Sequence, residues 1–176
     1  MDRFKHEPIE RHEALAPFSR DHYTGLVQAQ HLKKAADSDA VARRKAIASF
    51  VDAWDTEIAE HFADEQRLLL ELMDDADRQR LLEEHQQLTA LAQQARELRQ
   101  KTDPDAAAVR QIGQMLEQHI RWEERELFVR LQNRLSPGQL AELGHRTEPI
   151  EQSRPRNACR DGGRTSGGGG EAQGRA

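Results

Sequence analysis

The sequence has a single cysteine, Cys159, few aromatic residues (5%) and no long apolar run. One cysteine cannot form an intramolecular disulfide, and it excludes zinc sites built from several cysteines, so a reducing compartment is expected. No segment approaches the roughly 20 apolar residues that span a bilayer, and the residues after Met1 lack the apolar stretch of a signal peptide. We therefore expect a soluble, cytoplasmic protein with no membrane partner.

The charge is acidic overall and unevenly distributed. The net charge is −5, with 20 Lys and Arg against 27 Asp and Glu in residues 1–145, and 6 Arg against 4 acidic residues in 146–176. An acidic body argues against nucleic-acid binding through the folded part. A length of 176 residues suits one domain with a sizeable core.

Composition and periodicity predict an all-α protein. Apolar residues recur at helical spacing in four long stretches joined by short connections, and Ser19 can cap the first of them. The expected helices cover about 19–36, 40–73, 78–101 and 104–135, with a short fifth from 137 to about 145. We predict an antiparallel up-down-up-down four-helix bundle over residues 18–145, a lead-in over 1–17, and a disordered Arg/Gly/Ser-rich tail over 146–176.

Polar residues interrupt the apolar stripes of all four predicted helices. His61-x-x-x-Glu65 and His119-x-x-x-Glu123 repeat one spacing, and residues four apart lie on one helix face. His22 and His85 hold matching positions on the other two helices. The six inward groups are thus four imidazoles and two carboxylates, which can converge at the centre of a bundle.

A lone inward histidine is commonly a hydrogen-bonded core residue, and a lone glutamate can pair with an arginine. Six such groups on four helices are harder to explain in this way, because each unpaired buried charge costs several kcal/mol. A cation removes that cost, and six ligands suit two metal ions better than one. The predicted metal ligands are His22, His61, Glu65, His85, His119 and Glu123, with Glu124 in reserve.

Other metal motifs fit less well. The di-iron bundles of the ferritin type carry Glu-x-x-His on two helices, whereas this chain has one such match, Glu142-x-x-His145, near its end. A zincin His-Glu-x-x-His motif is absent. Mixed nitrogen and oxygen ligands suit Fe, with Mn and Zn as alternatives.

In these residues the chain resembles the hemerythrin-like (hemerythrin/HHE cation-binding) family. The resemblance covers about His22 to Leu135 and follows the family's order: a lone His, a His-x-x-x-Glu, a lone His, and a final His with a nearby acid. It implies that His22 and His61 hold one iron, that His85 and His119 hold the other, and that Glu65 and Glu123 bridge them. An oxo or hydroxo group would complete the di-iron centre.

Two positions depart from the oxygen-carrying members of that family. Those proteins have another histidine four residues after the third-helix His, where this chain has Thr89. Their last carboxylate falls five residues after its His, which would select Glu124, whereas Glu123 has the phase of the apolar stripe. His31 cannot replace the missing ligand, because it lies on the opposite helix face from His22.

The ligand count then leaves an open position on each iron. The resemblance implies a protein that binds O2, NO or peroxide for sensing, storage or detoxification, with no catalytic side chain predicted. An oxidoreductase that consumes peroxide or NO, or that repairs iron–sulfur clusters, is an alternative. A structural metal-binding interaction protein with an unknown protein partner is another. Glu57 and Glu126, one turn from predicted ligands, could orient an imidazole or could be solvated charges.

Overall fold

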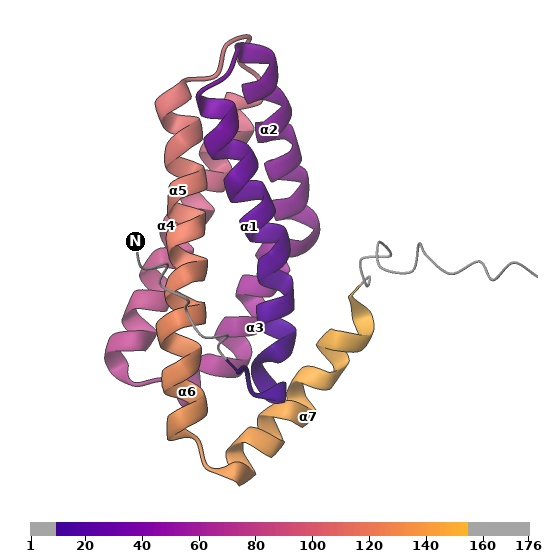
Figure 1. The fold of residues 1–176 in the computed structure, drawn as a ribbon, viewed down its shortest axis with the longest axis vertical. Coiled ribbons are helices and arrows are strands. Elements are labelled where there is room, and N and C mark those ends of the chain that lie inside the picture. The colour runs from indigo at the N-terminus through magenta and orange to yellow at the C-terminus, as the bar shows by residue number, and fades with distance from the viewer. Residues whose placement is uncertain (1–9, 155–176) are drawn as a thin grey trace, which may run out of the picture.

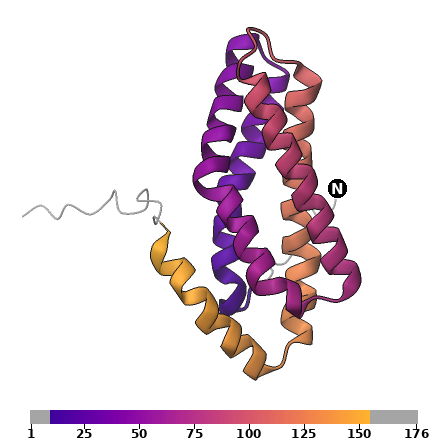
Figure 2. The same cartoon turned by 180° about the vertical axis from the view of Figure 1, so that it is seen from behind.

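The computed structural model describes residues 10–154, which form helices joined by short turns and contain no strand (Figures 1 and 2). The all-α prediction is therefore confirmed. The α-helices are α1 (Ala16–Ala36), α2 (Ala40–Ala53), α3 (Ala59–Leu69), α4 (Asp75–Leu98), α5 (Ala106–Trp122), α6 (Phe128–Arg134) and α7 (Pro137–Ser153). Short helical turns complete the chain: η1 (Glu13–Leu15), η2 (Trp54–Ile58), η3 (Leu70–Leu72) and η4 (Glu123–Leu127).

Each of the second and fourth predicted helices contains a turn of π-helix. Turn η2 joins α2 to α3, and turn η4 joins α5 to α6, so the chain stays helical through both. Such wider turns are rare and often lie at functional sites. Here η2 ends shortly before His61, and η4 begins at Glu123. Apolar periodicity does not reveal them, because one extra residue in a turn leaves most of the stripe in place.

Side-chain caps define most helix starts. Asp39, Asp74, Asp105 and Ser136 each accept a hydrogen bond from a backbone N–H in the first turn of the following helix. The prediction for Ser19 was wrong, because α1 begins earlier, at Ala16, with a proline in its first turn.

The long helices pack side by side. Helix α1 contacts α2 and α5, and α4 contacts the same two helices (Figure 1). Two apolar clusters fill the space between them. The upper cluster lies towards the α1–α2 and α4–α5 turns and includes Leu32, Ile47, Phe50, Leu88 and Ile112. The lower cluster lies towards α7 and includes Phe18, Leu69, Leu81, Phe128 and Leu143.

Helix α7 differs from the prediction. It was expected to end near His145, but it continues to Ser153, because Leu143, Thr147 and Ile150 follow helical spacing and are buried. Residues 146–153 therefore do not belong to a disordered tail. Likewise the predicted lead-in is partly folded, since Ala14 and Leu15 are buried. The rest of the predicted lead-in and tail, 1–9 and 155–176, lies outside the described residues.

Among residues 10–154, no helix combines the length and the apolar character that crossing a bilayer requires.

Candidate metal centre

The six predicted ligands lie together between the upper and lower clusters. All six side chains are buried, and both carboxylates are 0% exposed. Helix α1 provides His22, α3 provides His61 and Glu65, and α4 provides His85. Helix α5 provides His119, and the first residue of η4 is Glu123. The structure therefore brings the whole predicted set to one level of the helices.

The six side chains form two overlapping clusters. His22 and His61 share Glu65 and Glu123 in the first cluster, and His85 and His119 share the same two glutamates in the second. Within each cluster, one nitrogen or oxygen per residue lies within 4.8 Å of all the others. Both His-x-x-x-Glu pairs place the histidine Nε2 3.3 Å from the glutamate Oε1.

Contacts between helices link the two clusters. His22 Nε2 lies 3.1 Å from Glu123 Oε2, and His85 Nε2 lies 3.3 Å from Glu65 Oε2. Ligand atoms about 2.1 Å from one ion are separated by about 3 Å when adjacent and by about 4 Å when opposite. The observed separations are therefore those of donors that can share an ion. Each of the two glutamates, Glu65 and Glu123, directs one carboxylate oxygen to each cluster.

The inward atoms have no hydrogen-bond partner among the described residues. They are the Nε2 atoms of His22, His61, His85 and His119 and both carboxylate oxygens of Glu65 and Glu123. Buried polar atoms are nearly always hydrogen-bonded, and leaving one unpaired costs about 1–3 kcal/mol. Eight such atoms converging on two points fit metal cations, whose positive charge and empty orbitals accept these lone pairs.

The outward nitrogen of each imidazole, by contrast, has a partner. The Nδ1 atom of His22 lies 2.6 Å from Glu124, that of His61 lies 3.3 Å from Asp21, and that of His119 lies 2.8 Å from Glu84. The fourth, His85 Nδ1, lies 2.9 Å from the amide of Gln66. At His22, His61 and His119 the partner is a carboxylate, so Nδ1–H donates outward and Nε2 presents its lone pair inward, which is the tautomer that binds a metal. At His85 the contact is with the Gln66 Nε2, a donor, so Nδ1–H can donate outward only to the amide oxygen of a turned Gln66 side chain.

These four outer partners form a closed ring around the centre. Each one is the sequence neighbour of a ligand on its own helix but supports a histidine on a different helix. Asp21 on α1 supports α3, Gln66 on α3 supports α4, and Glu84 on α4 supports α5. Glu124 in η4 closes the ring back to α1. We call Asp21, Gln66, Glu84 and Glu124 the outer ring.

Asp21, Gln66 and Glu84 of the outer ring were not predicted from the sequence. Glu57 instead accepts a hydrogen bond from Thr24 at the surface, and Glu126 pairs with Arg130, so neither contacts a ligand imidazole. Adjacency to a predicted ligand would have been the useful signal. Glu124, the reserve ligand, has an outer role: it bonds His22 and Arg11, whereas Glu123 lies inside the cluster.

Aromatic rings enclose the imidazoles. Phe62 stacks on His85 with 3.9 Å between ring centroids, and Phe128 stacks on His22 at 5.6 Å. Both phenylalanines are buried. They limit rotation of the imidazole rings, so the inward donors are held in place before any ion binds.

Electrostatics favour charged groups in the metal-free centre. Burial opposes protonation of His22, but the carboxylates of Glu123, Glu124 and Glu65 outweigh it and raise the pKa of His22 well above its usual value. Burial also opposes ionisation of Glu65, yet His61, His22 and His85 hold the pKa of Glu65 well below its usual value. Despite burial, His22, Ser19 and Arg11 lower the pKa of Glu124 to about 2. The anionic carboxylates are the form that binds a cation.

Other histidines lie elsewhere. His31 and His145 are exposed, and His12 caps the η1 turn. Thr89, at the position of the missing histidine, is exposed and donates a hydrogen bond to the backbone carbonyl of His85.

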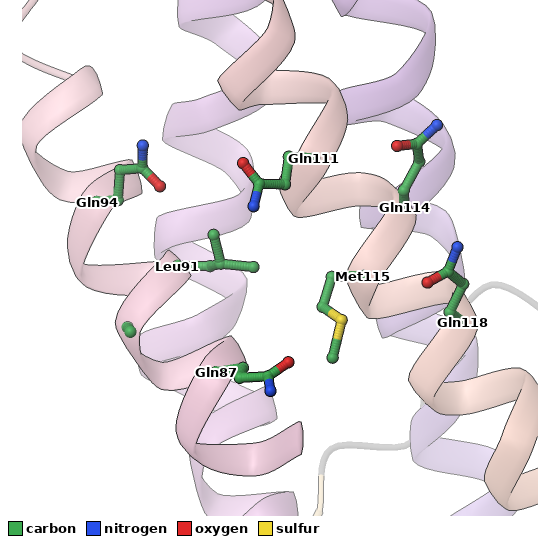
Figure 3. Close-up of a pocket in the computed structure, with 8 residues that line it drawn as sticks. Gln87, Leu91, Gln94, Gln111, Gln114, Met115 and Gln118 are labelled. Carbon is green, nitrogen blue, oxygen red and sulfur yellow. The ribbon is translucent and has the colours of Figure 1, made fainter. Parts of the chain in front are cut away.

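Two surface cavities differ in their relation to this centre. A groove of about 760 Å³ between α3 and α4 reaches the ring of His85 and is also lined by Phe62, Gln66 and Thr89. A second cavity, of about 440 Å³, lies between α4 and α5 (Figure 3). Uncharged side chains line it, five of them glutamines, and none of the six ligands is among them: Gln87, Ala90, Leu91, Gln94, Gln111, Gln114, Met115 and Gln118.

The helical fold and the converging donors define a protein that binds metal cations in its core. The family whose model matches residues 10–131 is described as "Hemerythrin HHE cation binding domain", and because this range exceeds half of the chain, the protein belongs to that family. The resemblance predicted from the motifs is thereby confirmed. No match was found among curated proteins or among solved structures.

Proposed function

We propose that this protein holds two iron ions in an antiparallel four-helix bundle and binds O2, NO or peroxide, for sensing, storage or detoxification. His22 and His61 would hold one ion and His85 and His119 the other, with Glu65 and Glu123 between them. Membership of a cation-binding family and the two overlapping donor clusters support this proposal.

The observation that carries the proposal is the set of eight buried, unpartnered donor atoms. A single ion would use one cluster and leave two imidazole nitrogens of the other without a partner. Two ions use all eight atoms. Imidazole and carboxylate donors suit iron, and manganese or zinc would compete for the same site.

Bound iron would supply redox chemistry and coordination positions that the protein does not fill. The protein itself orients the ligand imidazoles and encloses them. Asp21, Glu84 and Glu124 of the outer ring hold the proton on Nδ1 of three of the histidines, and Phe62 and Phe128 limit rotation of the imidazoles that they stack on. Each cluster offers two imidazoles and two carboxylates, which is fewer donors than an octahedral ion accepts, so an external ligand has room.

The groove between α3 and α4 supports access by such a ligand. It leads from the surface to the ring of His85, past Thr89. A purely structural metal would need no such path. The same observation favours a second candidate function, an oxidoreductase that consumes peroxide or NO at this centre.

Metal content is the first test. We expect the protein purified in air to contain about two irons per chain and to absorb in the near-ultraviolet, as an oxo-bridged or hydroxo-bridged pair does. Azide or NO should then change the spectrum. One zinc per chain, or no metal in a protein of undiminished stability, would contradict the proposal. Turnover of peroxide or NO would favour the oxidoreductase over the binding protein.

Thr89→His tests the open coordination position. A histidine there lies one helical turn from His85 and could occupy it. We expect Thr89→His to keep both metals and to bind azide at least about tenfold more weakly. The matched control is Gln86→His, an exposed neighbour in the same groove that does not lie one turn along from His85. Equal azide affinity in Thr89→His and the unaltered protein would contradict an open position on that side.

A further inference from the structure

The last described residue, Arg154, reaches the metal centre from outside the family match, which ends at residue 131. Its guanidinium forms ion pairs with two aspartates, Asp21 on α1 and Asp64 on α3. The Asp64 contact is 2.5 Å, and the Asp21 contact uses the Oδ2 atom that also lies 3.3 Å from His61 Nδ1. A chain of contacts therefore runs from Arg154 through Asp21 to a predicted ligand.

Helix α7 holds Arg154 at this position. Thr147 and Ile150 are buried on the face of α7 that packs on the rest of the protein, and the Thr147 hydroxyl donates to the backbone carbonyl of Ala14. The N–H of Arg154 donates to the carbonyl of Ile150, which closes the end of the helix. With α7 packed in this way, the guanidinium of Arg154 lies against Asp21 and Asp64.

These ion pairs are largely withdrawn from water. The side chains of Arg154, Asp21 and Asp64 are 19%, 20% and 13% exposed. Ion pairs at fully exposed sites contribute little because solvent screens them, whereas partly buried pairs are screened much less. The contacts of Arg154 with Asp21 and Asp64 are therefore screened less than ion pairs at the open surface.

Two other members of the outer ring also contact an arginine. Arg11 binds Glu124, which bonds His22, and Arg80 binds Glu84, which bonds His119. The fourth, Gln66, is neutral and supports His85. Carboxylate members of the ring thus each have a cationic partner, and for Asp21 that partner comes from α7.

We propose that Arg154 is a positioning residue for the metal centre: it holds Asp21 where Asp21 accepts the Nδ1 proton of His61. Docking of α7 thereby controls how tightly the ion at His22 and His61 is bound. Without the guanidinium, Asp21 is free to turn towards solvent and His61 loses its outer partner. Loss of such a partner typically weakens metal binding about 10–100-fold. The inference rests on the proposed two-ion site.

Cobalt titration of the metal-free, full-length protein tests this role. With a competing chelator, the unaltered protein should bind two Co²⁺ ions. Arg154→Gln should weaken one of the two by about 10–100-fold and leave the other unchanged. The matched control is Arg146→Gln, on the same helix, whose exposed ion pair with Glu71 touches no member of the outer ring. This control should retain both affinities.

Two further readouts separate positioning from general stability. Bound Co²⁺ shifts the exchangeable Nδ1–H proton resonances of its histidine ligands, and Arg154→Gln should move or broaden one of these while the control moves none. Asp21→Asn should weaken the same ion, and the double variant should be no weaker than Asp21→Asn alone, because both changes break one chain of contacts.

Three outcomes would overturn the inference. The first is unchanged Co²⁺ affinities in Arg154→Gln. The second is equal weakening of both ions together with a lower melting temperature of the metal-free protein, which would mean that Arg154 acts only on stability. The third is additive losses in the double variant. If the unaltered protein bound no Co²⁺ at all, the proposed function itself would fail, and that result is distinct from the other three.

Discussion

The upper cluster and the metal centre occupy the same helices at neighbouring levels, yet they are built in opposite ways. Leu32, Ile47 and Phe50 in the upper cluster are 0% exposed and purely apolar, so burying each contributes about 1.5–3 kcal/mol of stability. The metal centre is equally buried, but its inward atoms are unpartnered donors. The upper cluster thus stabilises the fold, whereas the metal centre keeps unpartnered donors that can bind ions and that cost some stability.

The largest expected effect is the loss of metal from Glu65→Ala. Glu65 offers one oxygen to each cluster, so its removal would affect both of the proposed ions. We expect metal content to fall from about two ions per chain to nearly none, measured by elemental analysis after dialysis. Glu57→Ala, an exposed change eight residues earlier, is the control and should keep both ions. A Glu65→Ala protein that still held two ions would refute the bridging position.

Phe50→Ala should show the reverse pattern. Phe50 is fully buried in the upper cluster, and truncating such a phenylalanine costs about 3–5 kcal/mol. Urea unfolding should show this loss with or without metal, while metal content stays unchanged. Val41→Ala on the same helix is 63% exposed and should cost less than about 0.5 kcal/mol. Loss of metal in folded Phe50→Ala would mean that the two levels are not independent.

Gly113→Ala tests how closely α1 and α5 approach within the upper level. A Cβ at residue 113 would lie 2.8 Å from the carbonyl oxygen of Ala29 and 3.0 Å from the Cβ of Leu32. The backbone of α1 cannot move aside as the end of a flexible side chain can. We therefore expect the free energy of unfolding, measured in urea, to fall by about 1–3 kcal/mol. Gly138→Ala is the control, because nothing lies within 4 Å of its Cβ position. Equal stability of the two variants would refute the close approach.

The smallest effect concerns an exposed ion pair at the upper end. Arg110 lowers the pKa of Asp37 below its ordinary value of 3.8. A lowered carboxyl pKa stabilises the fold above the ordinary value, and that contribution disappears as the pH falls through the lowered one. Metal-free Asp37→Asn should therefore melt slightly below the unaltered protein at pH 7, and this difference should shrink as the pH falls below 3.8. A difference in melting temperature that grew as the pH fell would mean that the Asp37–Arg110 pair does not stabilise the fold through the ionised carboxylate.

Sequence periodicity was sufficient for the inward residues of both levels. The spacing that places Ile47 and Val51 inside also places His61 and Glu65 there, so the six candidate ligands were predictable. Glu123 was preferred to Glu124 as a ligand on the same ground, and Glu123 is the one whose side chain lies in both clusters. The π-turns η2 and η4 were not predictable, because no residue type marks an added residue in a helical turn. The extent of α7 was missed because its apolar face is short.

What the sequence by itself determined is which face of each helix is buried and which donors that face carries. The tertiary structure alone decided which outer partner supports which histidine, and that α7 brings Arg154 to Asp21. The physical reason is one of geometry. A helix has a fixed period of about 3.6 residues, so direction around its own axis can be read from spacing. Contacts between helices depend on their relative height and rotation, and packing of the whole fold sets both.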